Sequence, residues 1–323
     1  MRELLVIGMG PGHPDQITIQ AVRALNRADV LFRIDKGDAK SGLNAAREEI
    51  LRRHVSGAGY RVVDIPEPPR DRSPDLTAAG YRDAVGDWHE ARAELIEAAI
   101  AAELGADGVG AFLVWGDPSL YDSTLRIIDR LLARGAVDFE YTVVPGVTSA
   151  AALAAAHRVP LNRVGEPVFI TPARRIAGGL PEGLDSAVVM LDPGFTAAGF
   201  DDPALTVFWG AYLSTADETL ISGPLAEVAD QITATKAELR ARHGWIMDTY
   251  LLRRDLGGPV EYQCSPRHHR ELRSHEPRRT AVIEQISGSI RAYGSALGPI
   301  VHKLLPKAYI HPDNSQRAGT GGI

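Results

Sequence analysis

The fold of this chain is decided by ELLVIGMGPGHPD at residues 3–15. The apolar half is typical of a buried strand, and the glycines that follow let the backbone approach a ligand closely. A dinucleotide-binding loop would read G-x-G-x-x-G before a helix, whereas His13 stands here in place of the third glycine and prolines stand at 11 and 14. Because proline has no N–H, the loop lacks two donors that could hold a pyrophosphate. The segment favours either a nucleotide-type ligand held without phosphate contacts or a tight strand-to-helix turn without a ligand.

Composition indicates a globular protein that can bury a sizeable core. The chain has 323 residues, 45% of them hydrophobic and 24% charged, which favours two domains. No run of about 18 apolar residues could span a membrane, and the chain enters a core strand at once instead of a signal peptide. Cys264 is the single cysteine and fits a reducing compartment, so we expect a cytoplasmic protein. The net charge of −6 argues against a general nucleic-acid surface.

Charge divides the chain unevenly. Residues 256–323 carry nine Lys/Arg and five Asp/Glu, and their hydrophobic periodicity is weak. We expect an N-terminal domain at 1–146, a second domain at 147–255 and a basic, poorly ordered tail at 256–323. Within the tail, Cys264, His268 and His269 have donor atoms suited to zinc, but a second pair at metal-site spacing is missing. We therefore expect no metal.

Strand and helix patterns alternate in the first half of the chain. The β-branched apolar runs predict strands at 4–7, 30–32, 61–65, 109–114 and 141–144, and helical patterns predict helices at 16–27, 43–53, 78–103 and 123–133. This alternation predicts a five-stranded parallel sheet covered on both faces. The proline-rich loop at 66–74 is either a solvated connection or a lid.

The second half has a different pattern. Strands are predicted at 168–170, 187–191, 205–209, 218–222 and 246–251, with convincing helices only at 148–156 and 225–240. Too few helices remain for a fully parallel arrangement, so hairpins must join some strands in a mixed sheet. The fold class is therefore α/β with a parallel sheet in the first half and a mixed sheet in the second, and we expect a ligand cleft between the two halves.

Two further junctions resemble the first in position. WGDPSLY at 115–121 follows the fourth predicted strand, and VPGVTSAAA at 144–152 follows the fifth. Ligands of open α/β sheets gather at such strand ends. Asp117 could accept from ligand hydroxyl or amino groups, or simply cap the helix that follows, and Thr148 or Ser149 is the expected N-cap of the next helix.

In order and spacing, these three segments resemble the signature segments of the tetrapyrrole (corrin/porphyrin) methyltransferases, over residues 1 to about 255. The resemblance implies two αβα domains, S-adenosylmethionine as cofactor and a homodimer. Matched position by position, it implies cofactor contacts from the following residues: Pro11, Trp115, Gly116, Asp117, Leu120, Thr148, Ser149, Met190, Leu191, Tyr212 and Leu213.

A finer resemblance concerns the reaction. FRIDKGD at 32–38, TPARR at 171–175 and FWGAYLSTADET at 208–219 are similar to the branch of the family that methylates precorrin-5 to precorrin-6A with loss of acetate, in cobalamin biosynthesis. The uroporphyrinogen methyltransferases carry an arginine-lysine pair in the strand before the Gly-Asp-Pro turn, where this chain has Phe112-Leu113-Val114. Uroporphyrinogen is therefore not the expected substrate.

Loss of acetate needs a general acid or base, and the acceptor's carboxylates need cations. Asp35 and Tyr121 are the catalytic candidates, with helix capping and plain packing as their structural alternatives. The candidate substrate-binding cations are Arg33, Lys36, Lys40, Arg174 and Arg175. Three other functions stay open on the sequence: another tetrapyrrole methyltransferase, a nicotinamide-dependent oxidoreductase, and a tetrapyrrole carrier without catalysis.

Overall fold

The computed structural model describes residues 1–35, 41–57, 59–69 and 77–254. The predicted tail at 256–323, with Cys264, His268 and His269, lies outside the described residues, as do Lys36 and Lys40. In the described part of the chain, no helix is both long and apolar enough to cross a bilayer.

The first sheet is parallel throughout and has the strand order β3-β2-β4-β1-β5. Its strands are β1 (Arg2–Gly8), β2 (Val30–Asp35), β3 (Arg61–Pro66), β4 (Val109–Val114) and β5 (Phe139–Val144). The predicted five-stranded parallel sheet is confirmed, and most strands extend beyond the predicted apolar runs. Strand pairing through backbone groups continues where the side chains become polar, as at the end of β2.

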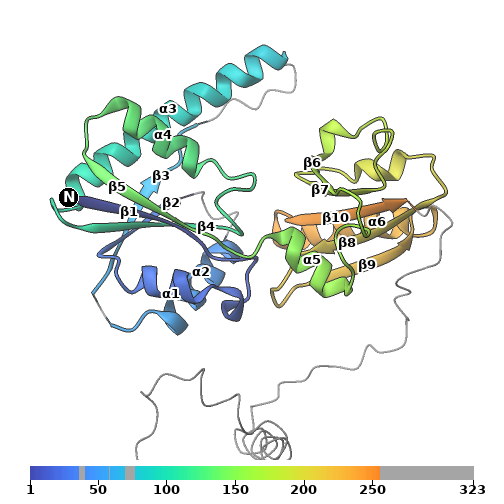
Figure 1. Ribbon diagram of the computed structural model, residues 1–323, viewed down its shortest axis with the longest axis horizontal. Helices are drawn as coiled ribbons and strands as arrows, with labels where there is room; N and C mark the ends of the chain where they lie inside the picture. The colour runs from blue at the N-terminus through green and yellow to red at the C-terminus, as the bar shows by residue number, and fades with distance from the viewer. Residues whose placement is uncertain (36–40, 58, 70–76, 255–323) are drawn as a thin grey trace, which may run out of the picture. The chain divides into compact units, whose positions relative to one another are not determined.

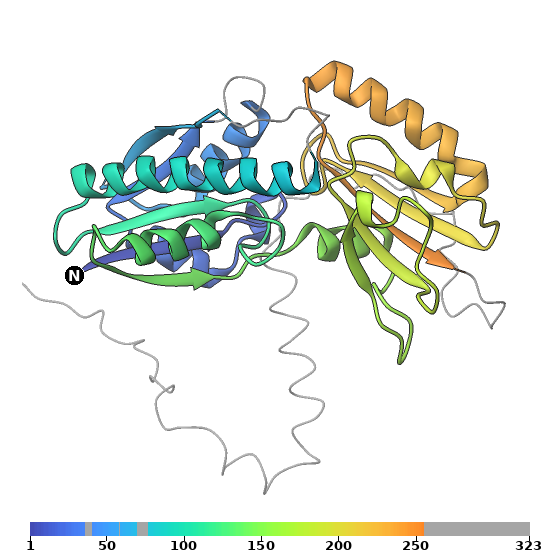
Figure 2. The ribbon, with the colours of Figure 1, turned by 90° about the horizontal axis from the view of Figure 1, so that it is seen from above.

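Four helices cover this sheet: α1 (Ile19–Leu25), α2 (Ser41–His54), α3 (Ala78–Glu103) and α4 (Thr124–Arg134). Figure 1 shows α1 and α2 on one face and α3 and α4 on the other. The alternation of side chains along β1 explains both cores, because Leu4 and Val6 pack with α3 and α4 while Leu5 and Ile7 pack with α1 and α2. In Figure 2, the long helix α3 lies over the sheet beside α4.

The predicted helix at 16–27 is wrong in its first part. A separate 3-10 turn, η1 (Pro14–Gln16), precedes α1, and the Thr18 hydroxyl then accepts a hydrogen bond from Ala21 N as the N-cap of α1. The periodicity predicted a single continuous helix, but the Thr18 cap starts α1 separately from the 3-10 turn.

The second sheet is mixed and has the order β6-β7-β10-β8-β9. Its strands are β6 (Phe169–Pro172), β7 (Ser186–Met190), β8 (Leu205–Ala211), β9 (Thr219–Pro224) and β10 (Asp248–Arg254). Only β6 and β7 pair in parallel, and the other neighbours are antiparallel, so the predicted mixed sheet is confirmed.

Two helices sandwich the second sheet. Residues of α5 (Ser149–His157) pack with Val188 and Leu251, whereas residues of α6 (Leu225–His243) pack with Val189 and Tyr250. These partners alternate along β7 and β10, so the two helices cover opposite faces (Figure 1). Short 3-10 turns, η3 (Ala173–Arg175) and η4 (Thr196–Gly199), follow β6 and β7.

Candidate functional site

The structure brings the three predicted junctions together. In the first sheet β1 lies between β4 and β5, and because all three are parallel their carboxyl ends share one edge. Gly10 and Gly116 exchange two backbone hydrogen bonds, from Gly10 N to Gly116 O at 3.1 Å and from Gly116 N to Gly10 O at 2.9 Å. The third junction joins through Gly146 N, which donates to the Asp117 carboxylate at 2.8 Å.

Glycine is required where these backbones meet. A Cβ added to Gly146 would lie 2.1 Å from Gly116 O, and one added to Gly8 would lie 2.6 Å from Gly146 N. Gly116 itself has φ +68°, yet a Cβ there would meet only Val147 O, at 3.9 Å. The backbones are therefore in close contact at Gly8 and Gly146, whereas open space lies beside the Cα of Gly116, whose N–H and C=O are both bonded to Gly10.

Asp117 fastens the second junction to the third. It is 9% exposed, its Oδ1 accepts from Ser119 N at 2.8 Å and from the Ser119 hydroxyl, and its Oδ2 accepts from Gly146 N. Burial raises the pKa of this carboxyl, but the hydrogen bonds from Ser119 and Gly146 outweigh burial and leave the pKa lowered. The alternative that Asp117 caps the next helix is wrong, because α4 begins at Thr124 and Asp122 Oδ1 accepts from Thr124 N at 2.6 Å.

The other cofactor candidates of the first two junctions are Pro11, Trp115 and Leu120. Pro11 is buried, and Trp115 and Leu120 are half-buried. The Trp115 ring lies 3.5 Å from the position that a Cβ on Gly12 would take. Its Nε1 is buried and has no hydrogen-bond acceptor among the described residues.

At the third junction Thr148 is the N-cap of α5, and its hydroxyl accepts from Ala151 N at 3.1 Å. The prediction of an N-cap at Thr148 or Ser149 is thus confirmed for Thr148. Ser149 is the first residue of the helix and is half-buried.

Backbone strain gathers at the candidate residues. Five non-glycine residues in the described ranges have positive φ, and Arg158 among them is the C-cap of α5. The other four lie at or beside predicted cofactor or catalytic positions: Tyr121 (φ 53°), Leu191 (φ 54°), Tyr212 (φ 47°) and Ser214 (φ 64°). Such conformations cost about 1–3 kcal/mol each and concentrate at functional sites.

The candidates in and beside the second sheet differ in what they can offer a ligand. Met190 ends β7 half-buried, and Leu191 is 58% exposed although it is apolar. Tyr212 and Leu213 are each 4% exposed, and the Tyr212 hydroxyl donates to Trp245 O at 2.5 Å. At 212 and 213 a ligand can therefore meet only the backbone.

Of the two catalytic candidates, the structure describes the side chain of one. Tyr121 is 41% exposed, and its hydroxyl donates to Ile170 O at 3.3 Å. Burial raises the pKa of this phenol, opposed by the nearby Arg174 guanidinium, so the phenol is protonated near neutral pH. Asp35 is the last residue of β2, and its side chain lies outside the described residues.

The described candidates for substrate binding differ in whether a carboxylate of the protein balances their charge. Arg33 holds Asp64 of β3 with two hydrogen bonds, one of them from Nη2 to Oδ2 at 2.8 Å, and this hydrogen bonding lowers the pKa of Asp64. Arg174 and Arg175 are exposed on η3. The charge of Arg33 is therefore largely balanced within the protein, whereas Arg174 and Arg175 face solvent.

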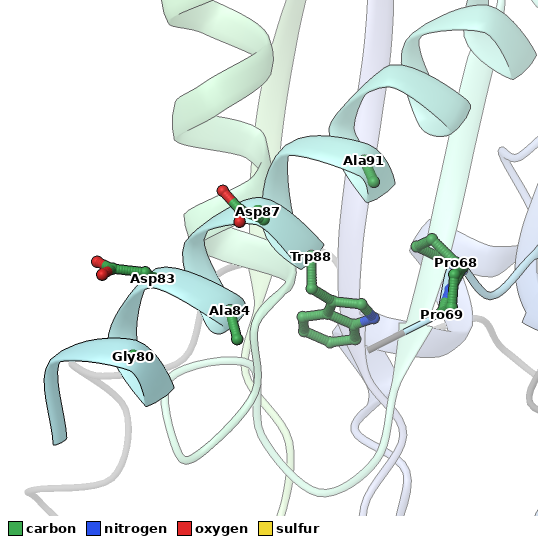
Figure 3. Close-up of a pocket in the computed structure, with 8 residues that line it drawn as sticks. All are labelled: Pro68, Pro69, Gly80, Asp83, Ala84, Asp87, Trp88 and Ala91. Atoms are coloured by element: carbon green, nitrogen blue, oxygen red, sulfur yellow. The ribbon is translucent and has the colours of Figure 1, made fainter. Parts of the chain in front are cut away.

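A cavity of about 440 Å³ lies away from these residues, between α3 and the start of the proline-rich loop (Figure 3). Its lining includes Pro68, Pro69 and the indole of Trp88, and Arg92 lies over that indole at 4.6 Å from the ring centroid. It contains none of the predicted site residues. Within the ranges that the structure describes, no three His, Cys, Asp or Glu side chains gather in a way that could hold a metal.

Comparison with known proteins agrees with this architecture. Residues 3–229 match the model of the tetrapyrrole (corrin/porphyrin) methylases. The chain belongs to this family. It is 49% identical over 254 residues to a precorrin-6A synthase [deacetylating] from Sinorhizobium sp, covering 79% of this chain and 96% of that protein. It is 29% identical over 191 residues to a precorrin-2 C(20)-methyltransferase from the same source, covering 58% of this chain and 72% of the relative.

A solved structure has a similar fold. The cobalamin synthesis related protein CobF of Corynebacterium diphtheriae is 36% identical, with a TM-score of 0.68, and the match covers 79% of this chain and 99% of that one. The predicted fold of two αβα units of the tetrapyrrole methylase type is thereby confirmed.

Sequence reasoning missed three residues joined by hydrogen bonds near the candidates of the second sheet: Asp192, Lys236 and Asp248. Lys236 is 4% exposed on α6, in line with the buried residues Ile232 and Leu239. A lysine at i+4 in an apolar stripe that continues to i+7 is the signal that could have revealed it, because lysine is almost never fully buried unless paired.

Proposed function

We propose that this protein is an S-adenosylmethionine-dependent C-methyltransferase that converts precorrin-5 into precorrin-6A with loss of acetate, in cobalamin biosynthesis. The observation that carries the proposal is the meeting of the three glycine junctions. Hydrogen bonds join these signature segments of the family and leave open space beside the Cα of Gly116. The reaction itself is supported by the 49% identity to the Sinorhizobium enzyme over 96% of its length.

The residues present suit a sulfonium nucleoside better than a dinucleotide. Pro11 and Pro14 offer no N–H to a pyrophosphate, whereas the open space beside the Cα of Gly116 lets a ligand that carries no phosphate approach the junctions. When bound, S-adenosylmethionine supplies an activated methyl group and leaves as a neutral thioether. Orientation of two bound reactants can contribute roughly 7–11 kcal/mol to such a transfer. In the second domain we assign cofactor contacts to Met190, Leu191 and the backbone at 212 and 213.

We assign the proton needed for acetate loss to Tyr121. Its protonated phenol can donate to the acetyl oxygen while water adds to the acetyl carbon; the bond from that carbon to the ring then breaks, acetate leaves and the electron pair stays on the ring. The partly exposed position of Tyr121 leaves it accessible to a macrocycle. Asp35 remains the second candidate. Arg174 and Arg175 are proposed to hold substrate carboxylates, and Arg33 would do so only by sharing its guanidinium with Asp64.

We further propose a cytoplasmic homodimer with no nucleic-acid or membrane partner. The single cysteine supports a reducing compartment and the net charge of −6 argues against a nucleic-acid partner, whereas the homodimer rests on the family resemblance alone. Size-exclusion chromatography with light scattering should give twice the 34.8 kDa mass of one chain.

The reaction is tested by incubating the purified protein with S-adenosylmethionine and precorrin-5. We expect equal amounts of S-adenosylhomocysteine and acetate. S-adenosylhomocysteine without acetate would point to another precorrin methylation. If neither product forms with a substrate that a known precorrin-6A synthase accepts, the proposed reaction is wrong.

A further inference from the structure

Contacts from α6 and β10 hold the turn after β7 in an unfavourable conformation. We define the β7 turn as residues 191–196. Leu191 opens it with φ 54°, and 58% of this leucine is exposed. A left-handed backbone and an exposed apolar side chain are both unfavourable, so the surrounding structure must impose the conformation.

Asp192 supplies one part of that constraint. It is 6% exposed, and both carboxylate oxygens accept hydrogen bonds within the turn, Oδ1 from Gly194 N at 3.2 Å and Oδ2 from Thr196 N at 2.7 Å. The Tyr250 hydroxyl of β10 also donates to Oδ2, at 2.8 Å. The carboxylate therefore closes the turn on itself and ties it to the middle strand of the sheet.

Helix α6 supplies the other part through two cations one turn apart. Lys236 Nζ donates to Asp192 O at 2.6 Å, and Arg240 Nη2 donates to Pro193 O at 2.7 Å. These residues stand at i and i+4 and so share one face of the helix. Two successive carbonyls of the β7 turn are thus fixed by one rigid element.

The same lysine connects to the second strained segment. Lys236 Nζ also donates to Asp248 Oδ2 at 2.7 Å, and Trp209 Nε1 donates to that oxygen at 2.8 Å. Asp248 opens β10 and pairs with Ala211, and Tyr212 N donates to Met247 O at 2.9 Å. One buried charge pair therefore lies between the turns that carry Leu191 and Tyr212.

We propose that Lys236 is a positioning residue, which with Asp192 and Asp248 holds the Leu191 and Tyr212 turns in the shape that receives S-adenosylmethionine. The inference rests on the proposed function, since that function makes these turns a cofactor site. A buried ion pair is a poor source of net stability, because apolar replacements of similar volume are often no less stable. Its benefit here is the fixed position of two backbone segments.

The test compares Lys236→Met with Ile232→Ala. Both residues are buried on α6, and Ile232 lies one turn earlier in the core, without a hydrogen bond to the β7 turn. We expect Lys236→Met to weaken binding of S-adenosylhomocysteine about tenfold by calorimetry, because Asp192 O loses a charged donor. In the cofactor-free protein, hydrogen exchange of the peptide spanning 191–196 should become faster. Ile232→Ala should lower the thermal midpoint while leaving affinity and this exchange unchanged.

A double variant separates positioning from stability. Adding Asp248→Asn to Lys236→Met removes the uncompensated buried carboxylate and should raise the thermal midpoint again, but affinity should stay low because Asp192 O still lacks its donor. Asp192→Asn tests the same turn if Lys236→Met fails to fold. Unchanged affinity and exchange in both Lys236→Met and Asp192→Asn would overturn the inference. No binding by the wild-type chain would count against the proposed function instead, and the exchange comparison would still decide whether Lys236 holds the turn.

Discussion

The backbones of Gly146 and Gly116 are in direct contact, so no side chain larger than the hydrogen atom of glycine fits at position 146. Gly146→Ala would place a Cβ 2.1 Å from Gly116 O, and backbone, unlike a flexible side chain, cannot yield locally. We expect a loss of about 3 kcal/mol in the free energy of unfolding, measured by urea titration. Gly86→Ala is the control, because a Cβ at this α3 position meets nothing within 4 Å and should add roughly 0.5–1 kcal/mol. Equal stability of Gly146→Ala and the wild type would contradict the close approach.

The Asp117 carboxylate should make stability depend on pH. Its pKa is lowered in the folded chain, so its stabilisation is complete above the pKa of the unfolded chain and is lost as pH falls through the folded pKa. Asp117→Asn replaces one of the two accepting oxygens with an NH2 group, which then faces the N–H of Gly146 or of Ser119. The free energy of unfolding should fall by roughly 1–3 kcal/mol at pH 7. The difference in free energy of unfolding between variant and wild type should narrow in acid, where the wild-type carboxyl is protonated and uncharged like the amide. The exposed Asp201→Asn is the control, and a gap that stays constant with pH would argue against an ionised Asp117.

The Tyr121 hydroxyl should matter for acetate release more than for cofactor binding. Tyr121→Phe keeps the ring and removes the proton donor, so we expect acetate formation to fall about a hundredfold with little change in S-adenosylhomocysteine affinity. The control is Tyr141→Phe, an exposed tyrosine on β5. Acetate release at the wild-type rate would remove Tyr121 from the chemistry and leave Asp35 as the candidate.

At the scale of elements, the start of α5 links capping to the third junction. Thr148→Ala removes the hydrogen bond to Ala151 N and should cost about 1 kcal/mol in thermal or urea unfolding. Thr148→Ser should keep the cap and recover most of the loss. Equal stability of Thr148→Ala and Thr148→Ser would show that the capping hydrogen bond contributes nothing.

Elements with strong local periodicity were predictable. The strand at 109–114 and the helix at 78–103 have the predicted bounds, because apolar spacing and the Thr77 cap act within a few residues. The start of α1 was not predictable from periodicity, since a single capping hydroxyl decides where that helix begins. The convergence of the junctions was inferred from their places at strand ends, and strand order β4-β1-β5 supplies the physical reason for it.

The polar interior of the second sheet was not predictable in the same way. Lys236, Asp192 and Asp248 come from three separate elements, and their spacing along the chain gives no sign that they meet. The fold alone brings them together. Similarly, the sequence offers Arg33 as a cation for substrate carboxylates, and only the pairing of β2 with β3 reveals Asp64 beside it.

At the scale of the whole molecule, the family match and the site occupy the same part of the chain. The Sinorhizobium relative is 96% covered by 79% of this chain, so about a fifth of this chain has no counterpart in that alignment. All the described candidate residues lie within residues 1–254. The proposed chemistry therefore draws on the part of the chain shared with that relative.

The most direct measurement is a calorimetric titration of the full chain with S-adenosylhomocysteine, repeated with NADPH. Three glycine junctions that build a sulfonium-nucleoside site predict saturable binding of one S-adenosylhomocysteine per chain and no binding of NADPH. Saturable NADPH binding, or a folded chain that takes up no S-adenosylhomocysteine, would contradict that assignment.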